Sequence, residues 1–251
     1  MSKLVFHFLM ESQRQRIPSH VVSYDGFELY TGHCHYAKNE IKPWIHQFCS
    51  KPCNNWFVAV VHDYATDIFN YYGFKKYIPN FSLAMSMICD RHGKEFEYLS
   101  DEEIMRIHDQ AKQLYGLIHS RWICTTPGLS MMKKKAFKKV RFGRCPRTAC
   151  KGTPLIPVGI TNVPNRHSVK LFCTRCADIY SAPCNKKIDG AFYGPAFPTV
   201  FLLAYPDLDL RDHFHTFDFK LFGFNLKSKK FENSPHNTNN HTEEYILMKK
   251  E

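Results

Sequence analysis

Two short pairs of cysteines constrain this 251-residue chain more than any other feature of its sequence. Cys145 and Cys150 enclose the string C-P-R-T-A-C, and Cys173 and Cys176 enclose C-T-R-C. Two thiol pairs of this kind, separated by about twenty residues, are what a tetrahedral zinc site with four cysteine ligands needs. The segment between the pairs is long enough to run out and back as a hairpin. Because four sulfurs close the coordination sphere, we expect a structural ion with no open position for water or substrate.

Two alternatives to a zinc site are a chance clustering of cysteines and a disulfide framework. The chain holds ten cysteines in all, but it is too long for a stapled mini-protein and the remaining thiols are scattered. We interpret Cys89 and Cys124 as buried thiols on apolar helical faces, and Cys184 as a residue without a metal role. A second group of metal-binding residue types has spacings that fit no standard site, and we interpret its members as ordinary side chains: His33, Cys34, His35, His46, Cys49 and Cys53.

The chain is basic, with 34 Lys and Arg against 23 Asp and Glu, a net charge of +11. Zinc bound to four thiolates would bring this to about +9, which still predicts an acidic partner. No segment approaches the run of about 20 apolar residues that spans a bilayer, so we expect no membrane role. The N-terminal stretch lacks the cleavage site of a signal peptide. Together with the unpaired cysteines, this indicates a reducing compartment, the cytoplasm or the nucleus.

Helical patterns dominate the middle of the chain. Residues 63–72 predict a short helix that ends at Gly73, and the next helix is expected to begin at Pro79. The strongest signal follows, where Ser100 and Glu103 have the spacing of a capping box. An apolar stripe then repeats at helical spacing through Ile104, Ile107, Ala111, Leu114, Ile118 and Trp122.

Gly116 interrupts this long helix at a cost of about 1 kcal/mol relative to Ala, and we expect a neighbouring helix to approach closely there. Thr126-Pro127 predicts the start of a further, basic helix. Short strands are predicted between the cysteine pairs, at Leu155, Ile156, Val158, Val169, Leu171 and Phe172. Residues 198–205 are apolar throughout and fit either a helix or a strand. We expect residues 1–43 to be irregular and residues 227–251 to form a polar, disordered tail.

A series of strings in a fixed order adds a resemblance to this picture. They are W-I-x-x-F-C at 44–49, D-Y, F-N and G within 63–73, L-Y-G-L-I-H-x-R at 114–121, F-G-x-C-P-R at 142–147, D-G-A-F-Y-G at 189–194, F-P at 197–198 and L-F-G-F at 221–224. With the spacing of the four cysteines, these strings make the chain resemble the regulatory (beta) subunit family of casein kinase II, a tetrameric serine/threonine protein kinase. The resemblance runs from about Trp44 to about Leu226.

The resemblance implies an α+β protein. Its parts would be a divergent N-terminal extension (1–43), an all-α helical domain (44–139), a small four-cysteine zinc-ribbon β domain (140–197), an extended C-terminal docking segment (198–226) and the polar tail (227–251). It further implies a regulatory subunit without catalytic activity. Two copies would form a homodimer through their zinc domains, and this dimer would recruit two catalytic (alpha) subunits into a heterotetramer.

The resemblance also implies that the C-terminal segment binds the catalytic subunit through Leu221, Phe222 and Phe224. In an extended strand the two phenylalanines, two residues apart, would share one face, and on a hairpin both could enter one groove. The alternative from sequence is that both belong to the core of this protein. The family more usually has Tyr at the first position, so Phe222 would lack one hydroxyl contact.

Nine Lys or Arg and no acidic residue lie between Lys133 and Lys151. A solvated surface is one interpretation, and docking of acidic protein substrates or of nucleic acid is the other. For a kinase that prefers acidic sites, acidic substrates are the more natural partner, and the residues expected to bind them are Lys133, Lys134, Lys135, Lys138, Lys139 and Arg141. Basic residues beside the ligands could offset the negative charge of the zinc–thiolate unit or could simply lie on the surface: Arg144, Arg147, Lys151 and Arg175.

Some family features are missing or diluted. The N-terminal acidic-serine cluster of the family is absent, and residues 91–103 hold five acidic against two basic side chains, which puts stimulation by polycations in doubt.

A zinc-ribbon nucleic-acid-binding protein is the second hypothesis for the function, although nothing between the cysteines supplies a stacking platform. An enzyme is the third, since no Ser/His/Asp arrangement, phosphate loop or open metal site is visible.

Overall fold

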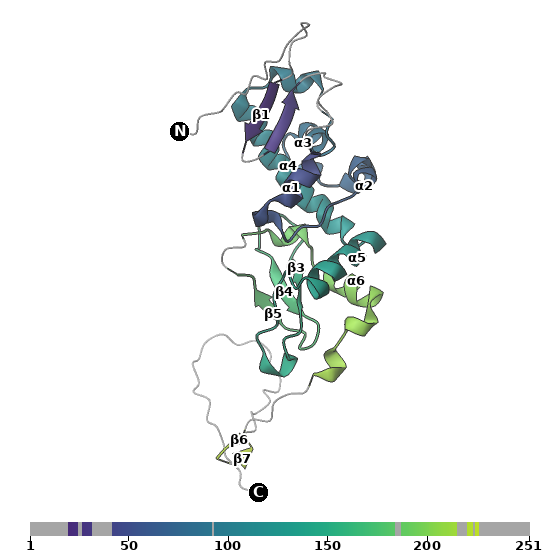
Figure 1. Ribbon diagram of the computed structural model, residues 1–251, viewed down its shortest axis with the longest axis vertical. Coiled ribbons are helices and arrows are strands. Elements are labelled where there is room, and N and C mark those ends of the chain that lie inside the picture. The colour runs from purple at the N-terminus through teal and green to yellow at the C-terminus, as the bar shows by residue number, and fades with distance from the viewer. Residues whose placement is uncertain are drawn as a thin grey trace, which may run out of the picture.

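The structure is a computed structural model that describes residues 20–24, 27–31, 42–91, 93–183, 187–214, 220–222 and 224–225 (Figure 1). The α-helices of this part are α1 (Trp44–Ser50), α2 (His62–Thr66), α3 (Phe81–Ile88), α4 (Asp101–Trp122), α5 (Thr126–Lys133) and α6 (Phe197–Ala204). The strands are β1 (His20–Tyr24), β2 (Phe27–Thr31), β3 (Leu155–Val158), β4 (Lys170–Cys173), β5 (Ile179–Ser181), β6 (Lys220–Leu221) and β7 (Phe224–Asn225).

Figure 1 shows α1 to α4 in one half of the molecule and the sheet β3–β4–β5 in the other, with α5 and α6 beside the sheet. Helices and a small antiparallel sheet confirm the predicted α+β class. No helix within the described residues is long and apolar enough to cross a membrane. The expected tail at 227–251 lies outside the residues that the structure describes, as do Cys34 and Cys184.

The prediction that residues 1–43 are irregular is wrong for part of that segment. β1 and β2 form an antiparallel hairpin in which His20 pairs with Thr31 and Tyr24 with Phe27. The sequence carries the local signal for it, because Asp25-Gly26 is the dipeptide that two-residue hairpin connections favour and β-formers flank it on both sides.

The predicted helix over 63–72 is broken. Helix α2 ends at Thr66, and a separate 3₁₀ turn covers Ile68–Tyr71. Asp67 lies between them with extended backbone, and its carboxylate accepts the Phe69 N–H at 3.0 Å, so it caps the second turn instead of continuing the first. Gly73 does end the segment, with a positive φ of 80°. The next helix starts two residues after Pro79, at Phe81.

Helix α4 is confirmed with its capping box. The Ser100 hydroxyl accepts the Glu103 N–H, and the Glu103 carboxylate accepts the Ser100 N–H at 2.9 Å. Every residue of the predicted apolar stripe is buried. The helix also buries side chains with polar groups, among them Tyr115 and His119.

These polar side chains hold a stretch at residues 57–61 that belongs to no helix or strand of the described structure. The Tyr115 hydroxyl donates to Val58 O at 2.9 Å and accepts the Val60 N–H at 3.1 Å. The His119 Nε2 accepts the Val58 N–H at 3.2 Å. Side chains of α4 thus replace the partner strand that buried backbone groups would otherwise need.

The close approach at Gly116 comes from an aromatic ring, so the expectation of a neighbouring helix is wrong. A Cβ at Gly116 would lie 2.4 Å from the ring of Phe192, which belongs to the 3₁₀ turn Gly190–Phe192 that follows the sheet. One turn further along α4, His119 Nδ1 lies 2.8 Å from Phe192 O. Since Nε2 accepts from Val58, Nδ1 carries the proton and donates to Phe192. Gly116 and His119 therefore join α4 to the sheet half of the molecule.

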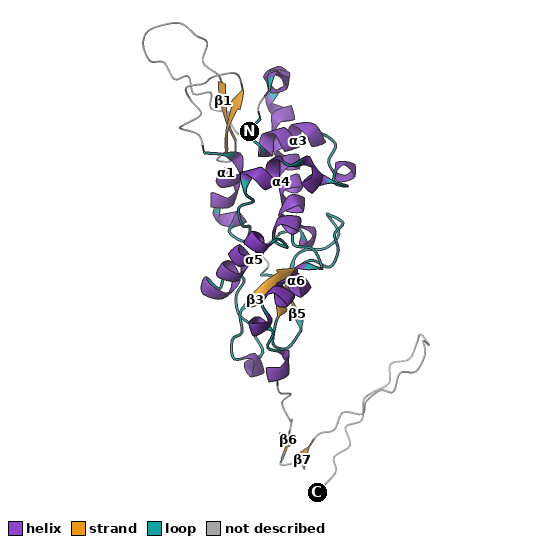
Figure 2. Ribbon diagram, turned by 90° about the vertical axis from the view of Figure 1, so that its right-hand side faces the viewer, coloured by secondary structure: helices purple, strands orange, loops and turns teal. Residues whose placement is uncertain are grey.

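The sheet has the order β3–β4–β5, all antiparallel. β3 and β4 confirm the strands predicted between the cysteine pairs, although Val169 precedes β4, and β5 is a further strand that was not predicted. Leu155 pairs with Cys173, so the start of β3 lies opposite the end of β4. The apolar run after Pro198 is a helix, α6, which packs against β3 as Figure 2 shows. Its Phe201 is fully buried and stacks on Phe137, with ring centroids 6.0 Å apart.

We predict that His119 makes the fold sensitive to acid. Burial lowers its folded pKa from 6.5 to about 3, so the unfolded chain binds the extra proton first. The stabilisation is therefore complete above pH 6.5 and is lost as the pH falls toward 3. Between pH 7.5 and 5.5 we expect His119 to account for a loss of about 1.4 kcal/mol in unfolding free energy.

The measurement is denaturant unfolding of the wild type and of His119→Phe at both pH values. The substitution leaves Val58 N–H and Phe192 O without partners, so it should cost about 2–5 kcal/mol at pH 7.5 and remove this part of the pH dependence. His62→Gln, at an exposed histidine, is the control. An unchanged pH dependence in His119→Phe would contradict the assignment.

Candidate metal centre

The structure brings together all four predicted cysteines. Their sulfur atoms lie within 4.8 Å of one another. Cys145 Sγ lies 3.9 Å from Cys176 Sγ, and Cys173 Sγ lies 3.9 Å from Cys150 Sγ. These separations are far beyond a disulfide bond of about 2.05 Å. They match the edge of about 3.8 Å expected for a tetrahedron with metal–sulfur bonds of about 2.3 Å.

The first cysteine pair sits on a tight loop closed by backbone hydrogen bonds. The Cys145 N–H donates to Thr153 O at 2.8 Å, and the Thr153 N–H donates to Cys150 O at 3.0 Å. Lys151 and Gly152 both have positive φ, at 50° and 69°, which turns the chain back at once. The loop therefore directs both sulfurs to the same side.

The second pair forms a matching loop at the end of β4. The Cys173 N–H donates to Asp178 O at 3.1 Å, and the Ala177 N–H donates to Cys173 O at 3.0 Å. Ala177 has a φ of 57°, so this loop also depends on a residue in the left-handed region. Because Leu155 pairs with Cys173, the β3–β4 register brings the two loops together.

Neighbouring side chains tie the loops to each other. Arg147 of the first loop and Asp178 of the second form an ion pair at 2.6 Å. Arg175 Nε of the second loop donates to the Thr153 hydroxyl of the first at 3.2 Å. Arg144 donates to Gly152 O at 2.9 Å. Three of the four basic residues expected near the site thus make contacts within the loops.

Tyr180 is a contact that sequence reasoning missed. Its hydroxyl lies 3.4 Å from Cys145 Sγ and 3.3 Å from Cys176 Sγ. It would donate a hydrogen bond to these sulfurs once they are thiolates, which helps to orient metal ligands. Tyr180 reaches the sulfurs because it lies on β5 opposite Leu171 of β4, the strand that ends at Cys173. This pairing follows from the β4–β5 register and has no local signal in the sequence.

The chemistry of the donor set fits a bound cation. Burial raises the pKa of the Cys150 thiol, and it raises that of Cys173 to about 11. Four thiolates packed this closely also repel one another, so a cation among them is what makes the charged form favourable. The four residues could hold one metal ion, and among the described residues no other group of three or more His, Cys, Asp or Glu side chains could do so.

The predicted basic surface is only partly available. Lys133 lies 3.5 Å from Asp207 Oδ2 and 4.1 Å from the centre of the Tyr205 ring. Lys135 turns inward and donates to Asn55 O at 2.9 Å and to Phe57 O, and burial lowers its pKa to about 8. The exposed members of the predicted set are Lys134, Lys138, Lys139 and Arg141.

The three predicted docking residues lie in a small hairpin formed by β6 and β7, in which Leu221 pairs with Phe224. Phe222 is not in a strand but in the turn, with a φ of 51°, so of the two arrangements considered from the sequence the chain forms the hairpin and not one extended strand. Its side chain is 88% exposed, which removes the alternative that it belongs to the core of this chain. Figures 1 and 2 both show the hairpin beyond the sheet half of the molecule.

Comparison with known proteins supports the family resemblance found in the sequence. Residues 43–225 match the family described as "Casein kinase II regulatory subunit". The chain belongs to this family. It is 37% identical over 190 residues to "Putative casein kinase II subunit beta-4" of Arabidopsis thaliana, covering 74% of this chain and 66% of that protein. It is 36% identical to "Casein kinase II subunit beta" of Schizosaccharomyces pombe over 188 residues, 74% of this chain and 79% of that protein.

The matched part spans about two thirds of the Arabidopsis relatives, beta-4 and beta-3. The family range 43–225 coincides with the resemblance found from the sequence motifs and contains both the four-cysteine cluster and the β6–β7 hairpin. Of the functions that the sequence left open, membership of this family favours the kinase regulatory subunit over the nucleic-acid-binding protein.

We predict that Cys173→Ser abolishes metal binding. A hydroxyl is a poor substitute for a thiolate toward soft and borderline metals, and Cys173 is fully buried, so no other residue can replace it. Elemental analysis of the purified protein should give one metal ion per chain for the wild type and almost none for the variant. Cys53→Ser, at an exposed cysteine outside the cluster, should retain the ion. Full metal content in Cys173→Ser would contradict the four-ligand site.

Proposed function

We propose that this protein is a non-catalytic regulatory subunit of a casein kinase II-type serine/threonine kinase, with one structural zinc ion per chain. In this proposal the zinc-bound ribbon forms a homodimer, and the dimer recruits and modulates two catalytic subunits. The observation that carries the proposal is the closed four-sulfur cluster within a chain of this family. A metal ion bound by four sulfurs stabilises the fold and has no open coordination position for water or substrate.

Zinc is the metal that suits the donor set. Four thiolates in a tetrahedron are typical of structural zinc, and the two pairs have the spacing of a zinc ribbon. The sheet consists of strands of four, four and three residues, which bury little apolar surface. A structural zinc ion supplies on the order of 10–16 kcal/mol of apparent binding free energy, so it can maintain this small unit.

Self-association through the ribbon is supported by its outer strand. β5 pairs only with β4 in the described structure and is therefore an edge strand. Ile179, the first residue of β5, is 52% exposed. An open edge with an exposed apolar side chain is a surface that a second copy can cover.

Recruitment of the catalytic subunit is assigned to the β6–β7 hairpin. Phe222 combines an exposed ring with a left-handed backbone conformation, and both are unfavourable in the isolated chain. Burial of the ring in a groove on a partner would stabilise the complex by about 1.5–3 kcal/mol, and aromatic anchors are frequent hot spots. Phe224 and Leu221, paired across the hairpin, would flank it.

Acidic substrates would bind the exposed part of the basic stretch. Lys134, Lys138, Lys139 and Arg141 lie together on the turn of helix that continues α5 and on the residues just after it. Their charges would attract acidic segments over a distance that salt shortens to about 8 Å at physiological ionic strength.

We predict that Phe222→Ala combined with Phe224→Ala abolishes recruitment of the catalytic subunit. Loss of two aromatic anchors should weaken the complex at least about 100-fold, since each contributes about 1.5–3 kcal/mol. The measurement is a pull-down followed by calorimetric titration with a casein kinase II catalytic subunit. Zinc content and the size of the free protein should not change.

Phe69→Ala is the matched control, because Phe69 is also a strongly exposed phenylalanine (81%) but lies in the helical half. It should bind the catalytic subunit like the wild type. Undiminished binding of the double variant would contradict the docking assignment, and phosphotransfer by the purified chain alone would contradict its non-catalytic role.

A further inference from the structure

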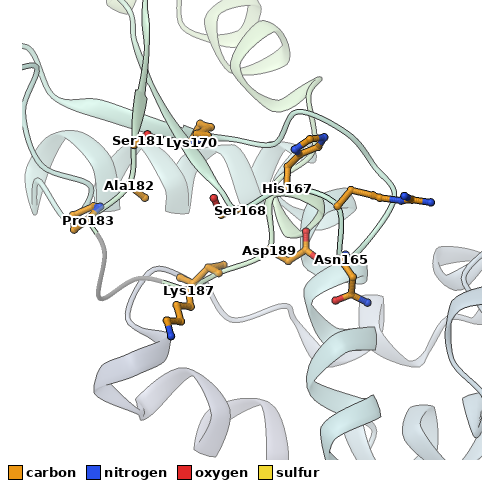
Figure 3. Close-up of a pocket in the computed structure, with 11 residues that line it drawn as sticks. Asn165, His167, Ser168, Lys170, Ser181, Ala182, Pro183, Lys187 and Asp189 are labelled. Carbon is orange, nitrogen blue, oxygen red and sulfur yellow. Dashed lines mark hydrogen bonds between the residues drawn. The ribbon is translucent and has the colours of Figure 1, made fainter.

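A recess lies on the sheet half of the molecule, lined in part by the segment between the two cysteine pairs. It has a volume of about 500 Å³ and is lined by three stretches of chain, 165–170, 181–183 and 187–189. Figure 3 shows Lys170 beside Ser181 on one side of the opening, Lys187 on another and His167 on a third, with Ser168 and Asp189 between them. Its size falls in the range of small-molecule sites.

The recess carries an excess of positive charge. Arg166, Lys170 and Lys187 line it against a single carboxylate, Asp189. Within the described residues, Arg166 and Lys187 make no ion pair and no side-chain hydrogen bond, and both are exposed. Lys170 is half-buried, and its ammonium group reaches only a neutral partner, the Ser181 hydroxyl at 3.3 Å. Lys170 makes no ion pair within the described residues, so its charge is available to a bound anion.

Asp189 makes no ion pair with these cations within the described residues. One carboxylate oxygen accepts the Ala191 N–H at 2.9 Å, and the other accepts the Asn165 N–H. The carboxylate thus caps the Gly190–Phe192 turn and closes the loop before Ser168. Its hydrogen bonds go to backbone N–H groups, and the recess keeps an excess of positive charge because three cations line it against this one carboxylate.

A second recess of about 480 Å³ adjoins the first. The two share Asn165, Lys187, Ile188 and Asp189, and the second continues to Lys51 and Lys112 of the helical half. Lys187 therefore lies between two hollows. In the second, Asp109 forms an ion pair with Lys112 at 3.0 Å, so the excess of positive charge belongs to the first recess.

We propose that this recess binds a small anion that carries more than one phosphate group. Arg and Lys with serine hydroxyls are the donors that phosphate oxygens prefer. The cations come from separate stretches of the recess wall, an arrangement that suits a ligand with several phosphate groups better than a single phosphate ion. This site is independent of the metal centre and of the β6–β7 hairpin, and it adds a ligand class to the proposed regulatory role.

The test is calorimetric titration of the zinc-loaded full-length protein with inorganic tripolyphosphate at 0.15 M salt. We expect saturable binding of one tripolyphosphate per chain. Arg166→Gln combined with Lys187→Gln should weaken binding at least about tenfold, because each removes a charge-assisted contact. Both side chains are exposed and unpaired, so the variant should fold like the wild type, which its melting temperature checks. Zinc content measured after the titration shows that the probe has not extracted the metal.

Lys75→Gln combined with Lys94→Gln is the matched control, since it removes two exposed charges from the helical half. It should change the affinity by less than about twofold, because charges beyond a Debye length are screened. Citrate should bind more weakly than tripolyphosphate. The proposal is overturned if binding is not saturable, if the control weakens it as much as the double variant does, or if citrate binds equally well.

Discussion

Four sulfur atoms within 4.8 Å of one another are the constraint on which the sheet half of this molecule depends. The two cysteine loops each need a residue in the left-handed region, and the β3–β4 register places them face to face. Without a cation, burial would favour the protonated thiols of Cys150 and Cys173, and the loops would be joined mainly by one ion pair, Arg147–Asp178, and the Arg175–Thr153 contact. With it, a sheet of three very short strands becomes a defined unit.

The sheet half is in turn anchored to the helical half through one face of α4. The ring of Phe192 packs against Gly116, where a side chain would leave no room for it. The His119 ring donates to the Phe192 carbonyl and accepts the Val58 N–H. The same helix, through Tyr115, also bonds backbone groups of the stretch at 57–61. These polar contacts are buried, so a backbone group that lost its partner could not turn to water, and they make the position of the ribbon specific. The strings that carry the family resemblance include this part of α4 and the D-G-A-F-Y-G segment that it contacts.

Local chemistry made part of this structure predictable. The cysteine spacing, the Ser100–Glu103 capping box and the apolar stripe of α4 depend on residues close together in sequence, and all three are confirmed. The β1–β2 hairpin was missed although Asp25-Gly26 signals it. The break at Asp67 was missed because its side chain competes with the helix for the Phe69 N–H.

Other features depend on contacts that no local pattern encodes. Lys135 was grouped with surface lysines, yet it reaches backbone carbonyls some 80 residues away in the chain. The partner of Gly116 is a ring that follows the sheet, and Tyr180 reaches the cysteines only through strand register. Phe222 lies in a turn, where its exposure and positive φ could not be read from the spacing of L-F-G-F. In each case the tertiary partner, and not the local propensity, decided the outcome.

X-ray absorption at the zinc edge of the purified protein tests the central claim most directly. The account predicts four sulfur scatterers at about 2.3 Å and no nitrogen or oxygen in the first shell. A shell that contains a light atom, or a protein that folds without any zinc signal, would contradict it.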